Sequence, residues 1–279
     1  MHLRLRSFLF KMKVTILNKE NQNKGEVDFP SQFSESYRPD LIRRAVHALQ
    51  SAARQAYGAN PDAGQRHSST ISKRRRNYRG CYGFGISRVN RKIHSRKGTR
   101  MFWVGATSPQ TRGGRRSHAP KADKIFEQKI NKKENQKAIR SAMAASVDKV
   151  IVAARGHKLP ETYPFVLAAD FENLNKTKEI EAALEKLGLQ AELTRSSVKK
   201  VRAGMGKLRG RKYRRKKGPL VVVSGKCNLE KAAKNLPGVD IVHVNALNAE
   251  VLAPGAQPGR ITLYTEKALE TIGKEKLFI

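Results

Sequence analysis

Apolar residues along this chain recur in two patterns, short runs and spacings of three or four positions, which together predict an α/β fold. Residues 14–17 alternate apolar and polar side chains as a strand does, and residues 220–223 form an apolar run of the kind buried in parallel sheets. Residues 41–57 instead carry apolar side chains at helical spacing, after Pro39 and before Gly58. The pattern predicts helices packed on a buried sheet.

The same two patterns continue beyond residue 123 and complete the predicted fold. Helical spacing covers residues 124–155, and Gly156 and Pro160 interrupt the end of that region. Further strands are predicted at 164–169, 189–194, 239–244 and 261–264, further helices at 177–187, 229–236 and from 266 onward, and a loop at 248–258. Alternating elements of this length predict an α/β fold with an open, mostly parallel sheet and helices on both faces, in one domain built from residues 12–57 and 124–279.

Residues 58–123 do not follow either pattern. Between Asp62 and Asp123 there is no acidic residue, but there are sixteen Lys or Arg and eight Gly. Such a segment repels itself and cannot build its own core, and loops this long are uncommon unless they are functional or disordered. We therefore expect a long irregular internal loop that is disordered in isolation and ordered when bound to a polyanion. Fully extended, each limb reaches at most roughly 100 Å.

The overall charge indicates the kind of partner. The chain carries 57 Lys and Arg against 23 Asp and Glu, a formal charge of +34. A second basic segment spans residues 199–217, and both basic segments contain aromatic residues, which a merely solubilising charge run does not need. No apolar run approaches the roughly 20 residues of a membrane span. These observations favour nucleic acid over a membrane surface.

The candidate RNA-binding residues are the cations and aromatics of these two segments. Arginine forks suit phosphate groups, and aromatic rings stack on bases. In the internal loop they are Arg66, Lys73, Arg74, Arg75, Arg76, Tyr78, Arg79, Tyr82, Phe84, Arg88, Arg91, Lys92, Arg96, Lys97, Arg100, Trp103, Arg112, Arg115 and Arg116; in the second segment they are Arg202, Lys207, Arg209, Arg211, Lys212, Tyr213, Arg214 and Arg215.

RNA and DNA are harder to separate on charge alone. No helix-turn-helix or zinc-finger pattern is visible that would place an element in a DNA major groove. A long, glycine-containing loop suits penetration between the helices of a folded RNA, which proteins recognise largely through shape, phosphates and 2′-hydroxyls. We expect RNA, with a DNA-compacting protein as a weaker alternative.

Enzymatic chemistry has weak support. Residues 224–226, Ser-Gly-Lys, follow an apolar strand but lack the spacing of a phosphate-binding loop, and Cys227 stands where the magnesium-binding hydroxyl belongs. Asp170 and Glu172 follow a predicted strand, where α/β enzymes often keep catalytic groups, but no base or nucleophile accompanies them. An RNA-modifying or RNA-processing enzyme that uses these strand ends stays open as the alternative.

Metal binding and disulfides have as little support. His67, Cys81, His94 and His118 lack zinc-ligand spacing, so neither a metal nor a cofactor is expected. Cys81 and Cys227 are the only cysteines, which favours a reducing, intracellular setting. Residues 1–11 lack the features of a signal peptide and are interpreted as an upstream start or a basic tail before Met12.

Several stretches resemble one known family. They are Arg100-Met-Phe, Arg112-Gly-Gly-Arg-Arg and Ala119-Pro-Lys in the loop, residues 202–219 in the second basic segment, and residues 236–248, 252–255 and 259–260 near the C-terminus. In this order they resemble the universal large-subunit ribosomal protein number four, in its archaeal and eukaryotic form. The likeness covers most of residues 12–270, and the lack of a eukaryotic C-terminal extension favours the archaeal type.

The resemblance implies a structural constituent of the large ribosomal subunit in the cytoplasm, with no enzymatic activity. It implies an α/β domain on large-subunit ribosomal RNA, a loop threaded into that RNA, and a loop tip, expected within residues 80–100, that helps line the peptide exit tunnel. The implied partners are large-subunit RNA, neighbouring large-subunit proteins and the nascent peptide at the tip. One copy per subunit is expected, without a homo-oligomer and without a membrane.

Overall fold

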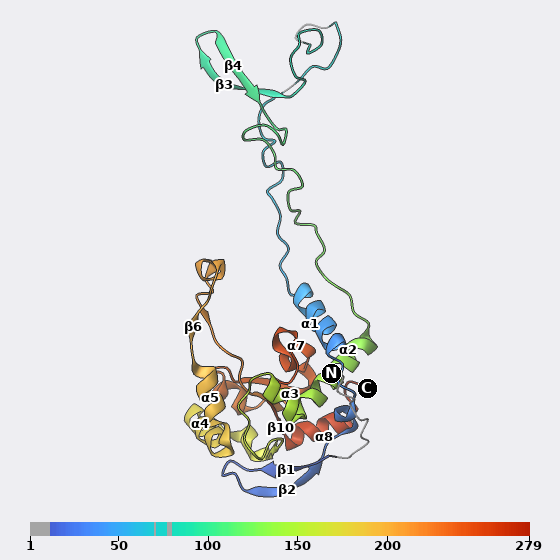
Figure 1. Ribbon diagram of the computed structural model, residues 1–279, viewed down its shortest axis with the longest axis vertical. Helices are drawn as coiled ribbons and strands as arrows, with labels where there is room; N and C mark the ends of the chain where they lie inside the picture. Colours follow the sequence, from blue (N-terminus) through green and yellow to red (C-terminus); the bar gives the residue numbers. More distant parts are fainter. Residues whose placement is uncertain (1–11, 70, 77–79) are drawn as a thin grey trace. The chain divides into compact units, whose positions relative to one another are not determined.

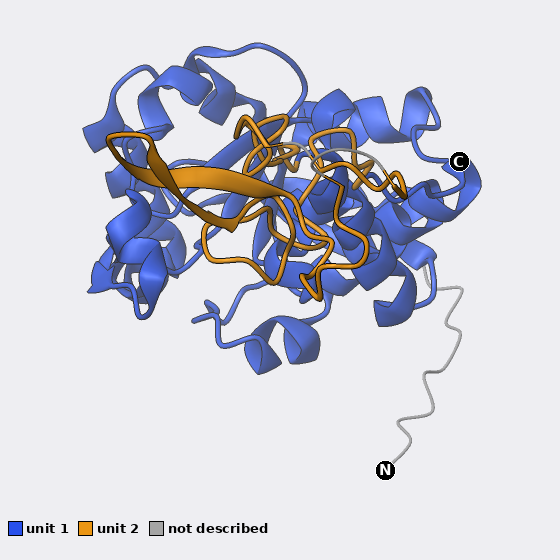
Figure 2. Ribbon diagram, turned by 90° about the horizontal axis from the view of Figure 1, so that it is seen from above, with its two compact units in different colours: residues 1–53, 127–279 blue, residues 54–126 orange. Residues whose placement is uncertain are grey.

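The computed structural model describes residues 12–69, 71–76 and 80–279. The chain divides into two compact units, which Figure 2 colours separately. We call the described part of the first, residues 12–53 and 127–279, the body, and the described part of the second, residues 54–126, the arm. The proposed basic tail at residues 1–11 and the candidate contacts Tyr78 and Arg79 lie outside the described residues.

The body is built on one six-stranded sheet (Figure 1). Its strands are β1 (Lys13–Leu17), β2 (Asn23–Asp28), β5 (Val166–Leu167), β8 (Leu220–Val223), β9 (Asp240–His243) and β10 (Thr262–Thr265). The spatial order is β2-β1-β5-β10-β8-β9; β2 pairs antiparallel with β1, and every other pairing is parallel. The predicted open, mostly parallel sheet is confirmed.

Helices cover both faces of that sheet because its central strands are apolar on both sides. In β8, Leu220 and Val222 face one core and Val221 and Val223 the other. The helical elements of the body are η1 (Ser31–Ser34), α1 (Pro39–Ala52), α2 (Lys132–Val147), α3 (Lys149–Ala154), η2 (Ala169–Asn173), α4 (Thr177–Leu184), η3 (Glu185–Leu189), α5 (Gln190–Ser197), η4 (Met205–Arg209), α6 (Asn228–Ala233), η5 (Val244–Ala246), α7 (Ala249–Leu252), η6 (Pro254–Ala256) and α8 (Glu266–Lys274).

The two cores divide these helices between them. The first core joins α1, α2, α7 and α8, with Ile42 and Met143 fully buried. The second joins α3, α4 and α6, with Leu184 and Leu187 buried. A fully buried side chain of this size contributes roughly 1.5–3 kcal/mol to folding, so the cores give the body a stability that does not depend on charge.

Four predicted elements need correction. The strand expected at 189–194 is wrong, because those residues form the end of η3 and most of α5. The helix expected over 41–57 ends at Ala52, and the one expected over 124–155 begins only at Lys132 and is divided between α2 and α3. The loop expected at 248–258 contains α7 and η6. Strand β2 was not predicted at all, because its residues are almost all exposed.

The arm contains more regular structure than the irregular loop that the sequence predicts. Strands β3 (Arg91–Lys97) and β4 (Arg100–Gly105) pair antiparallel in a two-stranded hairpin. The turn uses Gly98, whose φ is +57°. The assignment of residues 58–123 as an inserted RNA-binding loop stays a prediction.

Candidate nucleic-acid interface

The arm is a strongly basic surface whose acidic residues, Asp62 and Asp123, lie near its two ends. Within its described residues, no Lys or Arg forms an ion pair with a carboxylate. Several cations bond instead to neutral groups: Arg91 donates to the Ser87 carbonyl at 2.9 Å, and Arg96 to the Gly98 carbonyl at 2.9 Å. These bonds orient the guanidinium groups while leaving their charge uncompensated, which suits them to phosphate.

An aromatic ring lies between two of the predicted phosphate-binding arginines. The guanidinium carbons of Arg75 and Arg88 lie 5.2 and 5.0 Å from the ring centre of Tyr82, and Arg88 also donates to the Tyr82 hydroxyl at 3.1 Å. Cation–π contacts of this kind contribute about 0.5–1 kcal/mol at exposed sites. Phe84 is 71% exposed, and no cation among the described residues lies over its ring, so the ring offers a face for stacking.

The β3–β4 hairpin exposes apolar side chains on both of its faces. Trp103 pairs across the strands with Ile93, and Phe102 with Ser95, so the two aromatic rings point to opposite sides. Trp103 is 55% exposed and Phe102 is 44% exposed, with Arg100 at 5.2 Å from the Phe102 ring centre. A two-stranded hairpin is marginally stable in water by itself. Both faces therefore offer surface for a partner to cover.

The two limbs of the arm meet closely at its base. Arg54 lies 4.2 Å from the ring centre of Phe126, on which Tyr57 stacks at 5.9 Å. The Ala59 amide donates to the Pro120 carbonyl at 2.8 Å. A Cβ on Gly58 would fall 2.2 Å from the Ala122 nitrogen, so only glycine allows the limbs to lie this close.

The second basic segment, residues 199–217, folds back on itself in the body. Strand β6 (Lys200–Val201) pairs antiparallel with β7 (Tyr213–Arg214), and η4 lies between them. We call residues 198–215 the basic hairpin. The ammonium of Lys199 lies 3.7 Å from the Tyr213 ring centre. Arg202 donates from Nε to the Arg211 carbonyl at 3.0 Å, so this predicted RNA contact also holds the hairpin together.

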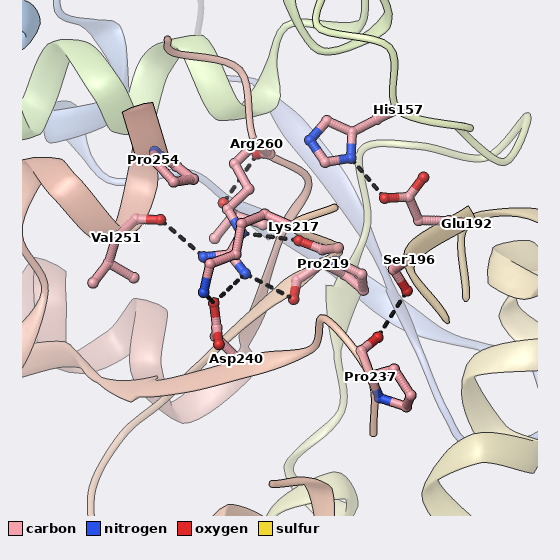
Figure 3. Close-up of polar contacts among 12 residues, drawn as sticks. His157, Glu192, Ser196, Lys217, Pro219, Pro237, Asp240, Val251, Pro254 and Arg260 are labelled. Carbon is pink, nitrogen blue, oxygen red and sulfur yellow. Dashed lines mark hydrogen bonds and ion pairs between the residues drawn. The ribbon is translucent and has the colours of Figure 1, made fainter. Parts of the chain in front are cut away.

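A buried polar network holds the root of the basic hairpin (Figure 3). Arg260, only 1% exposed, donates to the carbonyl of Gly218 at 2.9 Å and to Asp240 at 2.6 Å. Lys217 donates to the same Asp240 carboxylate at 2.8 Å. Burial favours the neutral acid, but the bonds from Lys217 and Arg260 outweigh it and lower the pKa of Asp240. The ion pair therefore persists at neutral pH.

A second buried group links α5, which precedes the hairpin, to Lys217 at the hairpin root. Glu192 is fully buried at 2.7 Å from His157 Nδ1, and Arg195 donates to it at 2.7 Å and to the Lys217 carbonyl at 2.7 Å. Burial alone raises the pKa of Glu192, but the hydrogen bonds from Arg195 and His157 overcome this and lower the pKa to about 2. For His157, burial dominates and lowers the pKa, which favours the neutral imidazole.

The structure distributes the predicted contacts over two surfaces. On the arm lie Arg66, Lys73, Arg74, Arg75, Arg76, Tyr82, Phe84, Arg88, Arg91, Lys92, Arg96, Lys97, Arg100, Trp103, Arg112, Arg115 and Arg116; on the basic hairpin lie Arg202, Lys207, Arg209, Arg211, Lys212, Tyr213, Arg214 and Arg215. Their assignment to RNA stays a prediction. Phe102 is not among the residues predicted from the sequence, although its ring is 44% exposed on the β3–β4 hairpin.

The strand ends proposed for a rival enzyme are occupied by structural contacts. Glu172, 6% exposed, accepts hydrogen bonds from the Ser224 amide at 3.1 Å and from the Thr265 hydroxyl at 2.7 Å. Its carboxylate therefore binds the first residue of the loop 224–226, whose sequence was compared with a phosphate-binding loop. Asp170 is paired with Lys24, which lowers the pKa of Asp170. Glu172 is thus committed to structural contacts, whereas Asp170 is half-exposed in a surface ion pair.

The described part of the chain contains neither a cluster of metal-ligating side chains nor a membrane-spanning helix. No group of three or more His, Cys, Asp or Glu side chains there could hold a metal ion. Among the helices described, none has the length and apolar character needed to cross a membrane.

Comparison with known proteins gives consistent matches over nearly the whole chain. Residues 27–275 match the model of a family described as "Ribosomal protein L4/L1 family". "Large ribosomal subunit protein uL4" of Nanoarchaeum equitans is 48% identical over 268 residues, which cover 96% of this chain and 100% of that protein. The proteins of the same name from Methanococcus aeolicus and Methanosphaera stadtmanae are 44% and 40% identical, covering 94% of this chain and 99% and 96% of their own lengths.

Proposed function

This chain belongs to the ribosomal protein L4/L1 family, of the archaeal type, and we propose that it is a structural component of the large ribosomal subunit that binds large-subunit ribosomal RNA. Its place is then the ribosome in the cytoplasm. The observation that carries the proposal is that the described Lys and Arg side chains of the arm and of the basic hairpin form no ion pair with a carboxylate. A large positive potential of this kind is stabilised by a polyanion.

In this proposal the arm enters the RNA and its cations neutralise phosphates from several RNA helices. Tyr82, Phe84 and Trp103 supply flat surfaces for exposed bases. The β3–β4 hairpin, which falls largely within the predicted tip at residues 80–100, lies at the exit tunnel and meets the nascent peptide there. Neighbouring large-subunit proteins complete the surroundings, with one copy of the chain per subunit.

The body contributes attachment rather than catalysis. Its network around Arg260 and Glu192 fixes the direction in which the basic hairpin leaves the sheet. Glu172 is held by Ser224 and Thr265 and Asp170 is paired with Lys24, which argues against an RNA-modifying activity at these strand ends. A non-enzymatic function is the simpler account.

Co-sedimentation with large subunits tests the proposal. We expect the tagged full-length chain, expressed in cells, to remain with large subunits through a high-salt wash. Arg74, Arg112 and Arg116, each exposed on the arm, are changed together to Gln. With purified large-subunit RNA, this variant is expected to reduce the slope of log affinity against log salt by about 2 to 3, because each lost phosphate contact contributes about 0.7–0.9.

The matched control removes the same charge from the body. Lys178, Lys186 and Lys231, all exposed, are changed together to Gln. This triple variant keeps the wild-type slope if the arm makes the RNA contacts. Equal loss in the two variants, or absence of the wild-type chain from washed subunits, would overturn the proposal.

A further inference from the structure

Two apolar side chains are exposed at the tip of the basic hairpin. Met205 is 62% exposed and Leu208 is 73% exposed, and both lie in the short 3-10 helix η4. Residues three apart in a 3-10 helix lie one above the other on the same side. Burying a side chain of this size contributes roughly 1.5–3 kcal/mol. The tip therefore presents a small apolar projection whose burial by a partner would be favourable.

The backbone holds this projection in one conformation. Gly204, which precedes η4, has φ +77° and ψ −170°, a region that side-chain-bearing residues almost never adopt. The Arg202 amide donates to the Lys212 carbonyl at 2.8 Å, and the Arg211 amide to the Gly206 carbonyl at 3.0 Å. A preorganised tip loses little conformational entropy on binding. Exposed apolar residues on such a tip indicate recognition.

The surroundings of the projection select the class of partner. Lys207 stands between Met205 and Leu208 in the sequence, and Arg209 directly follows. From Lys199 to Lys217 there is no acidic residue. A protein groove that accepted the apolar pair would also have to compensate this dense charge, whereas nucleic acid offers phosphates around apolar base faces. Proteins that kink nucleic acids use apolar wedges flanked by cations in this way.

We propose that Met205 and Leu208 form an apolar wedge that packs against unstacked bases of large-subunit RNA, with Lys207 and Arg209 on the flanking phosphates. This inference rests on the proposed function and deepens it. The cations supply affinity that depends on salt, and the wedge supplies recognition of a local RNA shape. Bases accessible to such a wedge occur in loops, bulges and distorted steps rather than in regular RNA helices.

The test separates the wedge from the charges. Met205→Ser with Leu208→Ser in the full-length chain should lower affinity for large-subunit RNA roughly 10- to 100-fold, by loss of apolar contact with the bases. The slope of log affinity against log salt should remain that of the wild type. Lys207→Gln with Arg209→Gln should instead reduce that slope by about 1.4 to 1.8.

Chemical probing of the RNA supplies a second readout. Wild-type protein should raise the 2′-hydroxyl reactivity of a few nucleotides, as expected for unstacked bases, and the Met205→Ser/Leu208→Ser variant should not. Val150→Ser is the control, since Val150 in α3 is 73% exposed and lies outside the basic segments. Gly204→Ala should act like the wedge variant, whereas Gly225→Ala, where φ is ordinary and space is open, should be neutral.

The outcomes that contradict the wedge differ from those that contradict RNA binding. If the Met205→Ser/Leu208→Ser variant changes RNA affinity less than twofold and leaves the 2′-hydroxyl reactivity as in the wild type, the wedge is overturned while the proposed function stands. The same holds if this variant lowers the slope of log affinity against log salt as much as the Lys207→Gln/Arg209→Gln variant does. Tighter binding of wild-type protein to vesicles containing phosphatidylserine than to RNA, abolished by Leu208→Ser, indicates a membrane contact and also overturns it. Absence of any salt-dependent RNA binding by wild type defeats the proposed function itself.

Discussion

The body and the arm use arginine in opposite ways. In the body, Arg260 is 1% exposed and its guanidinium is bonded to Asp240 and to the carbonyls of Gly218 and Val251. In the arm, guanidinium groups such as those of Arg91 and Arg96 remain at least partly exposed and bond to neutral groups. The buried arginine of the body has its counter-charge within the chain, whereas the described Lys and Arg side chains of the arm form no ion pair with a carboxylate.

This difference shows where the stability of each unit comes from. The body buries two apolar cores and compensates its internal charges, so we expect it to fold without a partner. The arm has a two-stranded hairpin with both faces exposed and a concentration of like charge. The arm is therefore expected to become ordered only when RNA neutralises its positive charge, as in segments that fold on binding.

The largest expected effect is on amide hydrogen exchange. On assembly into large subunits, amides of β3 and β4 should slow by on the order of 100-fold or more, because a segment with an opening free energy near zero becomes buried. Amides of β8 and β10 should change little, since they are already in the centre of the sheet. If the β3 and β4 amides exchanged equally slowly in the free and the assembled protein, the arm would be ordered without RNA and would not differ from the body in this respect.

The next largest effect concerns the buried carboxylate of the body. Glu192→Ala leaves Arg195 and His157 without their acceptor, and breaking a buried pair in this way costs about 3–5 kcal/mol. Urea unfolding of the free chain should show this loss. Leu208→Ser is a useful comparison because an exposed side chain changes stability by roughly 0.5 kcal/mol or less. A Glu192→Ala loss of that smaller size would show that the body does not depend on the network.

The smallest effect is the pH dependence of the same group. Because the pKa of Glu192 is lowered to about 2 from 4.5, its contribution is complete above pH 4.5 and is lost as the pH falls toward 2. Between pH 7 and pH 3.5 the loss is about 1.4 kcal/mol. The lowered pKa of His157 acts in the same direction, since its protonation on unfolding weakens stability below pH 6.5.

Glu192→Gln separates these two contributions. In this variant the free energy of unfolding should no longer fall between pH 4.5 and pH 2, the window assigned to Glu192. It should still fall below pH 6.5, the window assigned to His157. Thermal unfolding followed by circular dichroism at several pH values measures both. An unchanged acid dependence in Glu192→Gln would contradict the assignment of the lower window to this carboxylate.

The sheet could be predicted from the sequence because its strands are apolar on both sides. Residues 220–223 are a continuous apolar run and residues 261–264 are interrupted only by Thr262, and both correspond to central strands, β8 and β10. The segment at 189–194 was misassigned because Glu192 looked like the polar position of an alternating strand. It is in fact buried against His157, which lies 35 positions away, and a local pattern does not reveal a distant ion partner.

The basic surfaces were predictable as charge but not as shape. The absence of acids between Asp62 and Asp123 identifies the arm, yet it does not reveal the β3–β4 hairpin. Strand β3 has Ile93 as its one apolar residue and so gives no strand pattern to pair with the apolar run 101–104 of β4. The early end of the helix α1 was missed for a related reason. Tyr57 keeps helical spacing in the sequence, but its ring stacks on Phe126 at the base of the arm. Only the fold brings that partner close.

The closed geometry of the basic hairpin also sets an order of events in time. Lys200 pairs with Arg214 across a short loop, and hairpins of this size form in about 1–10 μs. The contact between Arg54 and Phe126 must enclose the entire arm, and closing a longer loop costs more entropy. We therefore expect the hairpin to form first and the base of the arm to close later, when α1 and α2 pack together as the body folds. A newly made chain should have its basic hairpin in place before the two ends of the arm are brought together.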